Sequence, residues 1–162
     1  MSTFALVAVH VTAARAACFA YRPVELEFQN RINQARTKHG LRPLTLTRAL
    51  SVVSRKHSSE MASRNSLYHT PLRTLGLRIT NWQAIGENVA YLNNAGSYNV
   101  AGRASKLFQM FMQSPAHRAN ILKSSFNHEG VGIQWSGSRL WLTETFEGQA
   151  TPGSRLSIPP AC

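Results

Sequence analysis

The chain has 162 residues, of which 43% are apolar, and this length and composition fit one globular domain with its own core. Its charge is unbalanced, because 18 Lys and Arg residues face only 7 acidic residues, all of them Glu. The formal net charge of +11 points to anionic surroundings. No specific nucleic-acid-binding module is recognisable in the sequence, which leaves a membrane lipid or an anionic cell-wall polymer as the expected partner.

The excess of positive charge is concentrated in residues 31–78, where Glu60 is the single acid. Two interpretations of this segment stay open. It presents a face that binds an anion, or it is a solvated surface that like charges keep soluble.

The N-terminal residues 1–22 differ in composition from the rest. They are mostly apolar and small, and the ARA at 14–16 has the small-x-small pattern at which signal peptides are cut. The segment lacks a basic start, and His10 interrupts its apolar run, so a disordered tail is the alternative to a signal peptide. At the other end, residues 151–162 form a Pro-rich tail without periodicity.

Cys18 and Cys162 are the two cysteines of the chain, one near each end. If the protein is exported, they can pair and tie the termini together, because chain ends often lie close in compact domains. The alternative is two separate thiols in the tails. The sequence leaves both open.

Two helices are expected in the first half of the chain. Across residues 25–39 apolar side chains recur at helical spacing, and Gly40 follows as a stop signal. Thr47 is placed to cap a second helix that ends near Asn65. On that helix His57 falls within the apolar stripe, which predicts a packed core histidine rather than a ligand.

The middle of the chain is less regular. Residues 66–84 hold turn formers and no clear period, which predicts an irregular loop containing His69. Loops of this length are more often functional than idle. Apolar residues at helical spacing over 99–112 predict a third helix, and SPAHRANIL at 114–122 predicts a short fourth one.

The short fourth helix brings a histidine into its first turn. Ser114 is expected to cap the helix, and Pro115 suits its first position because the missing N–H would have had no helical partner. His117 then meets the positive end of the helix dipole and the neighbouring Arg118, which both disfavour a charged imidazolium. A neutral imidazole, the form that binds metals or accepts a proton, is therefore expected.

The last third predicts two strands around a turn at 136–138, so that helices come first and strands mostly later, as in an α+β fold. Alternation along the second strand gives one face the residues Leu140, Leu142, Glu144 and Phe146. If this face meets the core, the Glu144 carboxylate needs a cation, a metal or a hydrogen-bond donor as its partner.

Five segments, in this order and spacing, resemble the CAP superfamily, also called the SCP/TAPS or pathogenesis-related-1 domain. They are NRINQARTKHGLRPLTL at 30–46, MASRNSLYH at 61–69, GENVA at 86–90, SPAHRANIL at 114–122, and GVGI followed by TETF. The likeness is to the short secreted bacterial branch. It implies a CAP domain over residues 23–150 with an α-β-α sandwich, in which helices cover both faces of a small antiparallel sheet.

The resemblance also implies a central cleft where two histidines and acidic residues meet, and which holds zinc or another divalent cation in several members. Matched by motif, His69 of YHTP, Glu87 of GEN and His117 of SPAHR belong to this cleft. Larger relatives have a further Glu where this chain has Ser114, so the four-residue cleft is incomplete. Glu144 stands where bacterial relatives usually have Gln, and it is a candidate to restore negative charge from the sheet side.

Each of these residues also has a purely structural interpretation. Glu87 can accept hydrogen bonds from the loop backbone at 70–86 instead of acting as a base or ligand. His69 and His117 can form a polar cluster satisfied by carboxylates and water instead of a metal site. Asn88 is expected to hydrogen-bond backbone alone.

The predicted function is that of a secreted binding module at the cell envelope, whose His69, Glu87 and His117 bind a divalent metal, zinc above all, with no organic cofactor. One alternative is a metal-assisted hydrolase of peptide or cell-wall substrate, with Glu87 as base to a zinc-bound water. Another is a protein that binds a lipid, a sterol or another small apolar ligand in a groove. Serine hydrolysis is disfavoured, because the chain has no G-x-S-x-G elbow.

Overall fold

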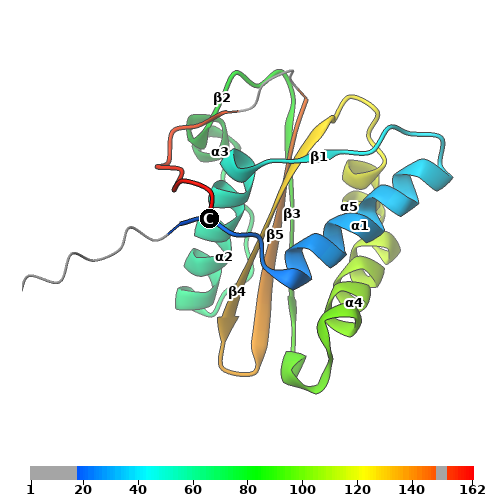
Figure 1. Cartoon of the computed structure of the whole chain (residues 1–162), viewed down its shortest axis with the longest axis vertical. Coiled ribbons are helices and arrows are strands. Elements are labelled where there is room, and N and C mark those ends of the chain that lie inside the picture. Colours follow the sequence, from blue (N-terminus) through cyan, green and yellow to red (C-terminus); the bar gives the residue numbers. More distant parts are fainter. Residues whose placement is uncertain (1–17, 149–152) are drawn as a thin grey trace, which may run out of the picture.

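A four-stranded sheet lies between two layers of helices in the computed structural model, which describes residues 18–148 and 153–162 (Figure 1). One face is covered by α2 (Arg48–Arg64) and α3 (Leu72–Arg78). The other face is covered by α1 (Pro23–Lys38), α4 (Val100–Gln113) and α5 (Pro115–Ile121). The predicted α+β class and the α-β-α sandwich are confirmed.

The strand order in the main sheet is β1-β4-β5-β3. Its strands are β1 (Thr45–Leu46), β3 (Ile85–Leu92), β4 (His128–Ser136) and β5 (Arg139–Glu147). β3, β5 and β4 run antiparallel, but the two-residue β1 pairs parallel with β4, so the sheet is mixed rather than wholly antiparallel. A separate small pair joins β2 (Ile79–Thr80) to β6 (Gly153–Ser154), and η1 (Ala95–Ser97) is a short 3₁₀ turn after β3.

The ends of the first two helices follow the predicted signals. α1 begins at Pro23, two residues before the predicted start, because proline suits the first helical turn. The Thr47 side chain accepts a hydrogen bond from the Leu50 N–H at 3.3 Å and so caps α2. α2 ends at Asn65, whose φ of 47° is the left-handed conformation of a helix C-cap.

Three elements differ from the expectations. The segment 66–84 is not an irregular loop throughout, because it contains α3 and β2. α3 buries only Leu75 of its seven residues, so its sequence has no apolar stripe to reveal it. β3 was not expected as a strand; Val89 and Ala90 are buried on opposite faces of the sheet, which removes the alternation typical of a half-exposed strand.

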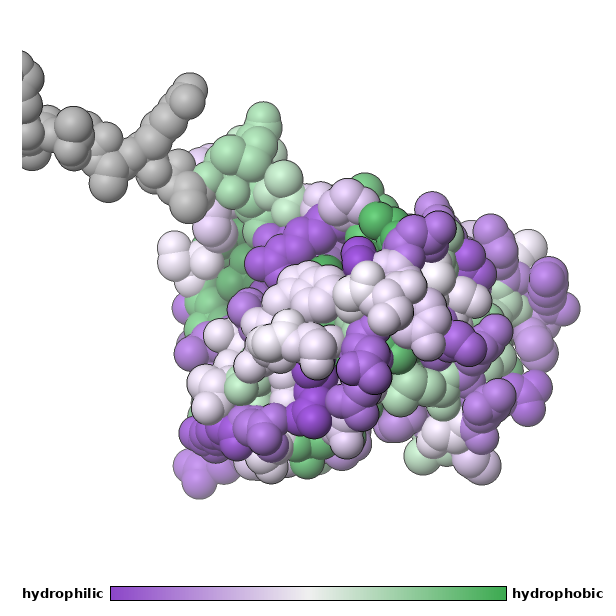
Figure 2. All heavy atoms as spheres, turned by 90° about the horizontal axis from the view of Figure 1, so that it is seen from below, coloured by the Kyte–Doolittle hydropathy of each residue, from purple (hydrophilic) through white to green (hydrophobic). Residues whose placement is uncertain are grey.

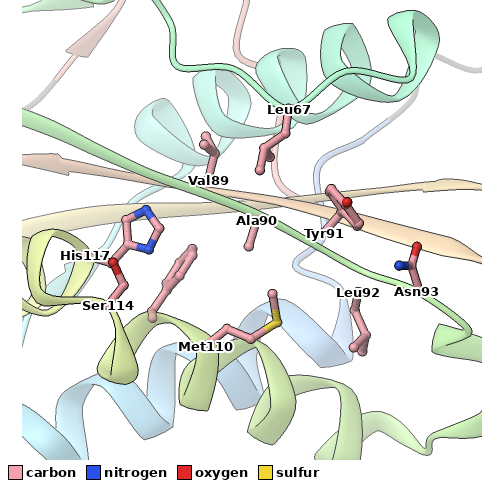
Figure 3. A pocket seen from close by; sticks show the side chains of 10 residues that line it. Leu67, Val89, Ala90, Tyr91, Leu92, Asn93, Met110, Ser114 and His117 are labelled. Atoms are coloured by element: carbon pink, nitrogen blue, oxygen red, sulfur yellow. The ribbon is translucent and has the colours of Figure 1, made fainter.

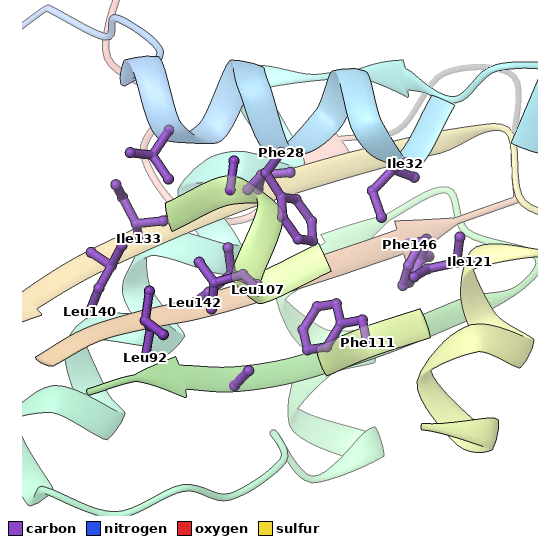
Figure 4. Packing of buried hydrophobic residues seen from close by; sticks show 14 of the residues in the cluster. Phe28, Ile32, Leu92, Leu107, Phe111, Ile121, Ile133, Leu140, Leu142 and Phe146 are labelled. Atoms are coloured by element: carbon purple, nitrogen blue, oxygen red, sulfur yellow. The ribbon is translucent and has the colours of Figure 1, made fainter. Parts of the chain in front are cut away.

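The larger part of the core lies between the sheet and the layer of α1 and α4. Phe28 of α1 meets Phe111 of α4 edge to face, with ring centroids 5.7 Å apart. Both rings are fully buried near Leu142 and Phe146 of β5 (Figure 4). The face predicted for the second strand of the hairpin is therefore the core face.

On the opposite face α2 packs directly on β4, and glycine makes this possible. A Cβ atom on Gly132 would lie 2.1 Å from the backbone nitrogen of Arg55, and Gly130 is equally crowded. The hydroxyl groups of Ser54 and Ser58 donate hydrogen bonds of 2.8 Å to the carbonyl oxygens of these two glycines. The GVGI motif is thus explained by the close approach of a helix backbone to a strand.

A disulfide bond joins Cys18 to Cys162, with their Cα atoms 4.9 Å apart. Beside it, the Phe19 N–H donates to the Pro160 carbonyl oxygen at 2.7 Å. Of the two interpretations of the cysteines, pairing is the one found. The possible cleavage pattern at 14–16 lies outside the described residues.

Part of the positive charge of residues 31–78 is used inside the molecule. Arg36 is buried, Arg55 pairs with Glu25, and Arg78 pairs with Glu60. Hydrophilic residues nevertheless spread widely over the face shown in Figure 2, with hydrophobic residues among them. Within the described ranges, none of the helices combines the length and the apolar character that crossing a membrane requires.

Candidate functional site

Three of the predicted site residues meet at the edge of the sheet that β3 forms. Glu87 lies in β3, His69 lies in the segment between α2 and α3, and His117 lies in α5. His69 Nδ1 is 3.2 Å from Glu87 Oε1, and the ring centroids of His69 and His117 are 6.4 Å apart. The structure therefore places His69 in contact with Glu87 and brings the second histidine close to the first.

Glu87 is also tied to the backbone, as its structural interpretation predicts. The same Oε1 atom accepts a hydrogen bond of 2.8 Å from the Thr70 N–H and lies 3.8 Å from His57 Nε2. The other oxygen, Oε2, is buried and has no hydrogen-bond partner among the described residues. One carboxylate oxygen thus holds the segment that carries His69.

His57 forms the wall behind Glu87. Its side chain is 1% exposed, as expected of a core histidine, and its Nε2 lies 2.8 Å from the carbonyl oxygen of Tyr68. Its Nδ1 lies 3.4 Å from Glu60 Oε2. His57 therefore packs beside the site without opening into it.

The predicted neutral form of His117 is supported, but by other causes than those expected. Burial lowers the pKa of His117, and the neighbouring His69 lowers it further. The ring centroid of Phe111 lies 4.7 Å from that of His117 and contributes to this apolar surrounding. Burial and a second imidazole thus favour the neutral form of the ring.

The start of α5 was only partly predicted. Pro115 occupies its first turn as expected, but the Ser114 side chain accepts no capping hydrogen bond. The Ser114 backbone carbonyl accepts from the Arg118 N–H at 2.9 Å, and Ser114 lines the cavity described below. The expectation that the Ser114 side chain caps this helix is wrong.

Asn88 does more than bind backbone. Its Nδ2 donates to the carbonyl oxygen of His117 at 3.1 Å and to Glu144 Oε2 at 3.2 Å, while its Oδ1 accepts from Asn120 Nδ2 at 2.9 Å. The assignment of Asn88 to backbone alone is therefore wrong. Its side chain connects α5, which carries the second histidine, to the buried face of the sheet.

Glu144 points to the face of the sheet opposite to Glu87, because it stands across from Asn88 in the β3–β5 register while Glu87 stands across from Thr145. Burial raises the pKa of Glu144 to about 8. Burial and the neighbouring Glu144 raise the pKa of Glu129 well above its ordinary value. Glu144 has the hydrogen-bond partner that its burial requires, but the structure does not bring it to the two histidines.

The fit of a metal ion depends mainly on the two imidazoles. Within residues 18–148 and 153–162, no group of three or more His, Cys, Asp or Glu side chains is arranged to hold an ion. Zinc binds imidazole nitrogen at about 2.0–2.1 Å, so rings whose centroids are 6.4 Å apart must approach each other to share one. The His69 side chain is 57% exposed and has the space to do so. An ion held by both histidines therefore requires His69 to move towards His117.

A cavity of about 520 Å³ adjoins His117 and follows β3. Figure 3 shows β3 passing between Leu67 on one side and Met110 on the other, with His117 at one end and Asn93 at the other. The cavity could not be found from the sequence, because its floor is the strand that the sequence did not reveal.

Comparisons with known proteins agree with this geometry. The profile of the CAP (Cysteine-rich secretory protein) family matches residues 29–144. The uncharacterized protein YkwD of Bacillus subtilis is 30% identical over 144 residues, which cover 85% of this chain and 51% of that protein. The chain thus spans about half the length of this curated relative.

Solved structures show the same fold at low sequence identity. An extracellular protein containing an SCP domain from Bacillus anthracis is 23% identical, with a TM-score of 0.61 over 78% of this chain and 40% of that one. NaASP2, crystallised with Zn²⁺, is 9% identical, with a TM-score of 0.62 over 90% of this chain and 91% of that one. The family match over residues 29–144, together with the shared fold, shows that the chain belongs to the CAP family.

Proposed function

We propose that the chain is a secreted binding module whose His69 and His117 hold a divalent cation, zinc above all. The observation that carries the proposal is the way the two histidines meet. His69 follows α2, which covers one face of the sheet, whereas His117 lies in α5 with the helices of the other face. Their rings come within 6.4 Å of each other at the edge strand β3.

The surroundings of both rings suit metal binding. Glu87 Oε1 lies against His69 Nδ1, which leaves His69 Nε2 for an ion. A carboxylate that accepts from the second ring nitrogen is the usual partner of a metal-bound histidine, since it fixes the ring and raises its basicity. The low pKa of His117 keeps a lone pair available. When bound, the cation supplies a Lewis acid that can accept an oxygen donor from a ligand.

The position of Glu87 supports binding over hydrolysis. Its side chain is buried, and one oxygen already contacts the Thr70 N–H and His69 Nδ1. These contacts suit a residue that positions His69 better than a base that moves a proton from an exposed water.

Secretion and the cell envelope are supported by three observations. The Cys18–Cys162 disulfide is typical of oxidising compartments outside the cytosol. The chain resembles an extracellular protein of Bacillus anthracis, and its formal net charge of +11 suits an anionic cell-wall polymer or lipid as its surroundings.

Isothermal titration with zinc chloride tests the proposal. We expect His69→Ala and His117→Ala each to weaken zinc binding at least tenfold, since each removes one of two ligands. Glu87→Gln should weaken it roughly tenfold through the orientation of His69. His39→Ala is the matched control, because His39 is exposed and its ring contacts the Ala35 carbonyl and Arg118 rather than His69 or His117. Unchanged zinc affinity in both histidine variants would refute the proposal.

A further inference from the structure

The outer edge of β3 carries backbone groups that no strand pairs with in the described part of the chain. The Gly148 N–H donates to the Ala84 carbonyl oxygen at 2.8 Å. In the β3–β5 register, the backbone N–H and C=O groups of the even-numbered residues of β3 therefore point towards β5. Successive residues of an antiparallel strand point their N–H and C=O groups to opposite sides. Glu87, Val89 and Tyr91 therefore direct theirs away from the sheet.

Only the first of these three residues has a partner on that side among the described residues. Asn120 Nδ2 lies 3.4 Å from the Glu87 carbonyl oxygen. The outward N–H and C=O groups of Val89 and Tyr91 have no hydrogen-bond partner in the described ranges. Two donors and two acceptors thus alternate along one line, with the spacing of an extended chain.

These groups lie along the floor of the 520 Å³ cavity beside His117 (Figure 3). Its walls include Leu67 and Met110, whose side chains are 46% and 42% exposed. A groove with apolar walls and a row of unpaired backbone groups matches a strand whose side chains alternate between the two walls.

The features with which proteins usually protect an edge strand are absent from this part of β3. β3 pairs with β5 over eight consecutive residues without a bulge. After Glu87 the strand continues as NVAYL, without a charge or a proline. Edges of this length that face solvent are normally blunted by Lys, Pro or a bulge, because they otherwise recruit other chains.

A cation stands at the far end of the groove. Arg139 donates from Nε to Asn93 Oδ1 at 3.0 Å and from Nη1 to Asn65 Oδ1 at 2.5 Å. Its guanidinium lies 4.4 Å from the centroid of the Tyr91 ring. Both hydrogen-bond partners are neutral, and the described residues place no carboxylate in an ion pair with it.

We propose that the free edge of β3 binds an extended peptide segment as an additional antiparallel strand. The peptide pairs through its main chain with Val89 and Tyr91 and places apolar or β-branched side chains alternately against Leu67 and Met110. A carboxylate near its N-terminal end meets Arg139. This activity does not depend on a metal ion at the histidines.

The test uses the full chain in EDTA and a fluorescent peptide of sequence EVTVTV, blocked at both ends, with binding followed by fluorescence anisotropy. We expect saturable binding that falls at least tenfold when the peptide amides facing β3 are N-methylated, since methylation removes main-chain donors and keeps every side chain. Hydrogen exchange should slow at least tenfold at the Val89 and Tyr91 amides and stay unchanged at Ala90, which already faces β5.

Three protein variants locate the site. Leu67→Asp should weaken peptide binding at least tenfold, whereas Leu72→Asp, at a leucine that is 70% exposed and outside the groove, should leave it unchanged. Arg139→Gln should weaken binding of EVTVTV but not of QVTVTV. No saturable binding, binding insensitive to N-methylation, or protection of Val89 caused by self-association alone would each overturn the proposal, and none of them bears on zinc binding.

Discussion

Glu144 is a carboxyl group buried in the sheet with a second carboxyl group, Glu129, beside it. Burial raises its pKa to about 8, so it keeps its proton at neutral pH. The pKa of Glu144 is higher in the folded protein than in the unfolded chain. The free energy of unfolding is therefore highest below about pH 4.5 and falls as the pH rises through about 8. The folded protein therefore loses stability progressively as the pH rises from about 4.5 to about 8.

Replacing Glu144 with Gln should remove the part of this pH dependence that Glu144 contributes and leave that of Glu129, because an amide keeps the hydrogen bond with Asn88 and cannot ionise. Each pH unit between the two pKa values corresponds to roughly 1.4 kcal/mol, so the variant should gain on the order of 4 kcal/mol over the wild type between pH 5 and pH 9. Denaturant unfolding of both proteins at pH 5 and pH 9 measures this difference in the free energy of unfolding. Glu27→Gln, at a half-buried carboxylate that pairs with Arg31, is the control. A parallel pH profile for wild type and Glu144→Gln would contradict the account.

Sequence motifs identified the residues of the site better than their roles. His69, Glu87 and His117 were found through the YHTP, GEN and SPAHR motifs, and the structure brings them to one edge. The side-chain bonds of Asn88 and the separation of Glu144 from the histidines were not foreseeable. Both depend on which face of β3 and β5 each residue occupies, and that register is set by strand pairing far apart in the chain.

At the scale of elements, the helices with cap residues and an apolar stripe were predictable, whereas α3 and β3 were not. Thr47 and Asn65 mark the ends of α2, because local hydrogen bonds and backbone conformation decide where a helix begins and ends. α3 is held by one buried leucine, Leu75, and β3 is covered on both faces. Tertiary contacts stabilise these two elements, and such contacts cannot be predicted from the local sequence pattern.

The contact between α2 and β4 is the element interface most sensitive to a single atom. Gly132→Ala should lower the free energy of unfolding by about 3 kcal/mol, because its Cβ would meet the Arg55 backbone nitrogen at 2.1 Å and the backbone must move. Gly96→Ala, where a Cβ meets nothing within 4 Å, should change stability by less than about 0.5 kcal/mol. Urea unfolding of both variants measures these changes in the free energy of unfolding. Equal stability of the two would mean that α2 does not rest on the glycines.

At the scale of the whole molecule, the disulfide closes nearly the entire described chain, because its cysteines are 144 positions apart in sequence. Reduction should lower the free energy of unfolding by about 4 kcal/mol, because the unfolded chain regains the entropy of an open loop. For a protein of this size that corresponds to a Tm lower by roughly 10 °C. Calorimetry with and without reductant tests this. The Cys18→Ser, Cys162→Ser double variant should have the Tm of the reduced protein, and reductant should not change it. A wild-type Tm that does not change on reduction would contradict this account.

The fold places the proposed cation site where the two helical layers meet at one edge of the sheet. This arrangement explains why its ligands come from separated segments, and why an ion shared by them would join one layer to the other. The same edge carries the groove along β3, so a bound peptide would end beside the histidines.

The most direct test of the central claim is an NMR titration of the histidine side chains with zinc. We predict that the imidazole resonances of His69 and His117 change together and saturate at one equivalent, while those of His39 do not move. A change at only one of the two rings, or at neither, would contradict a shared ion at the edge of β3.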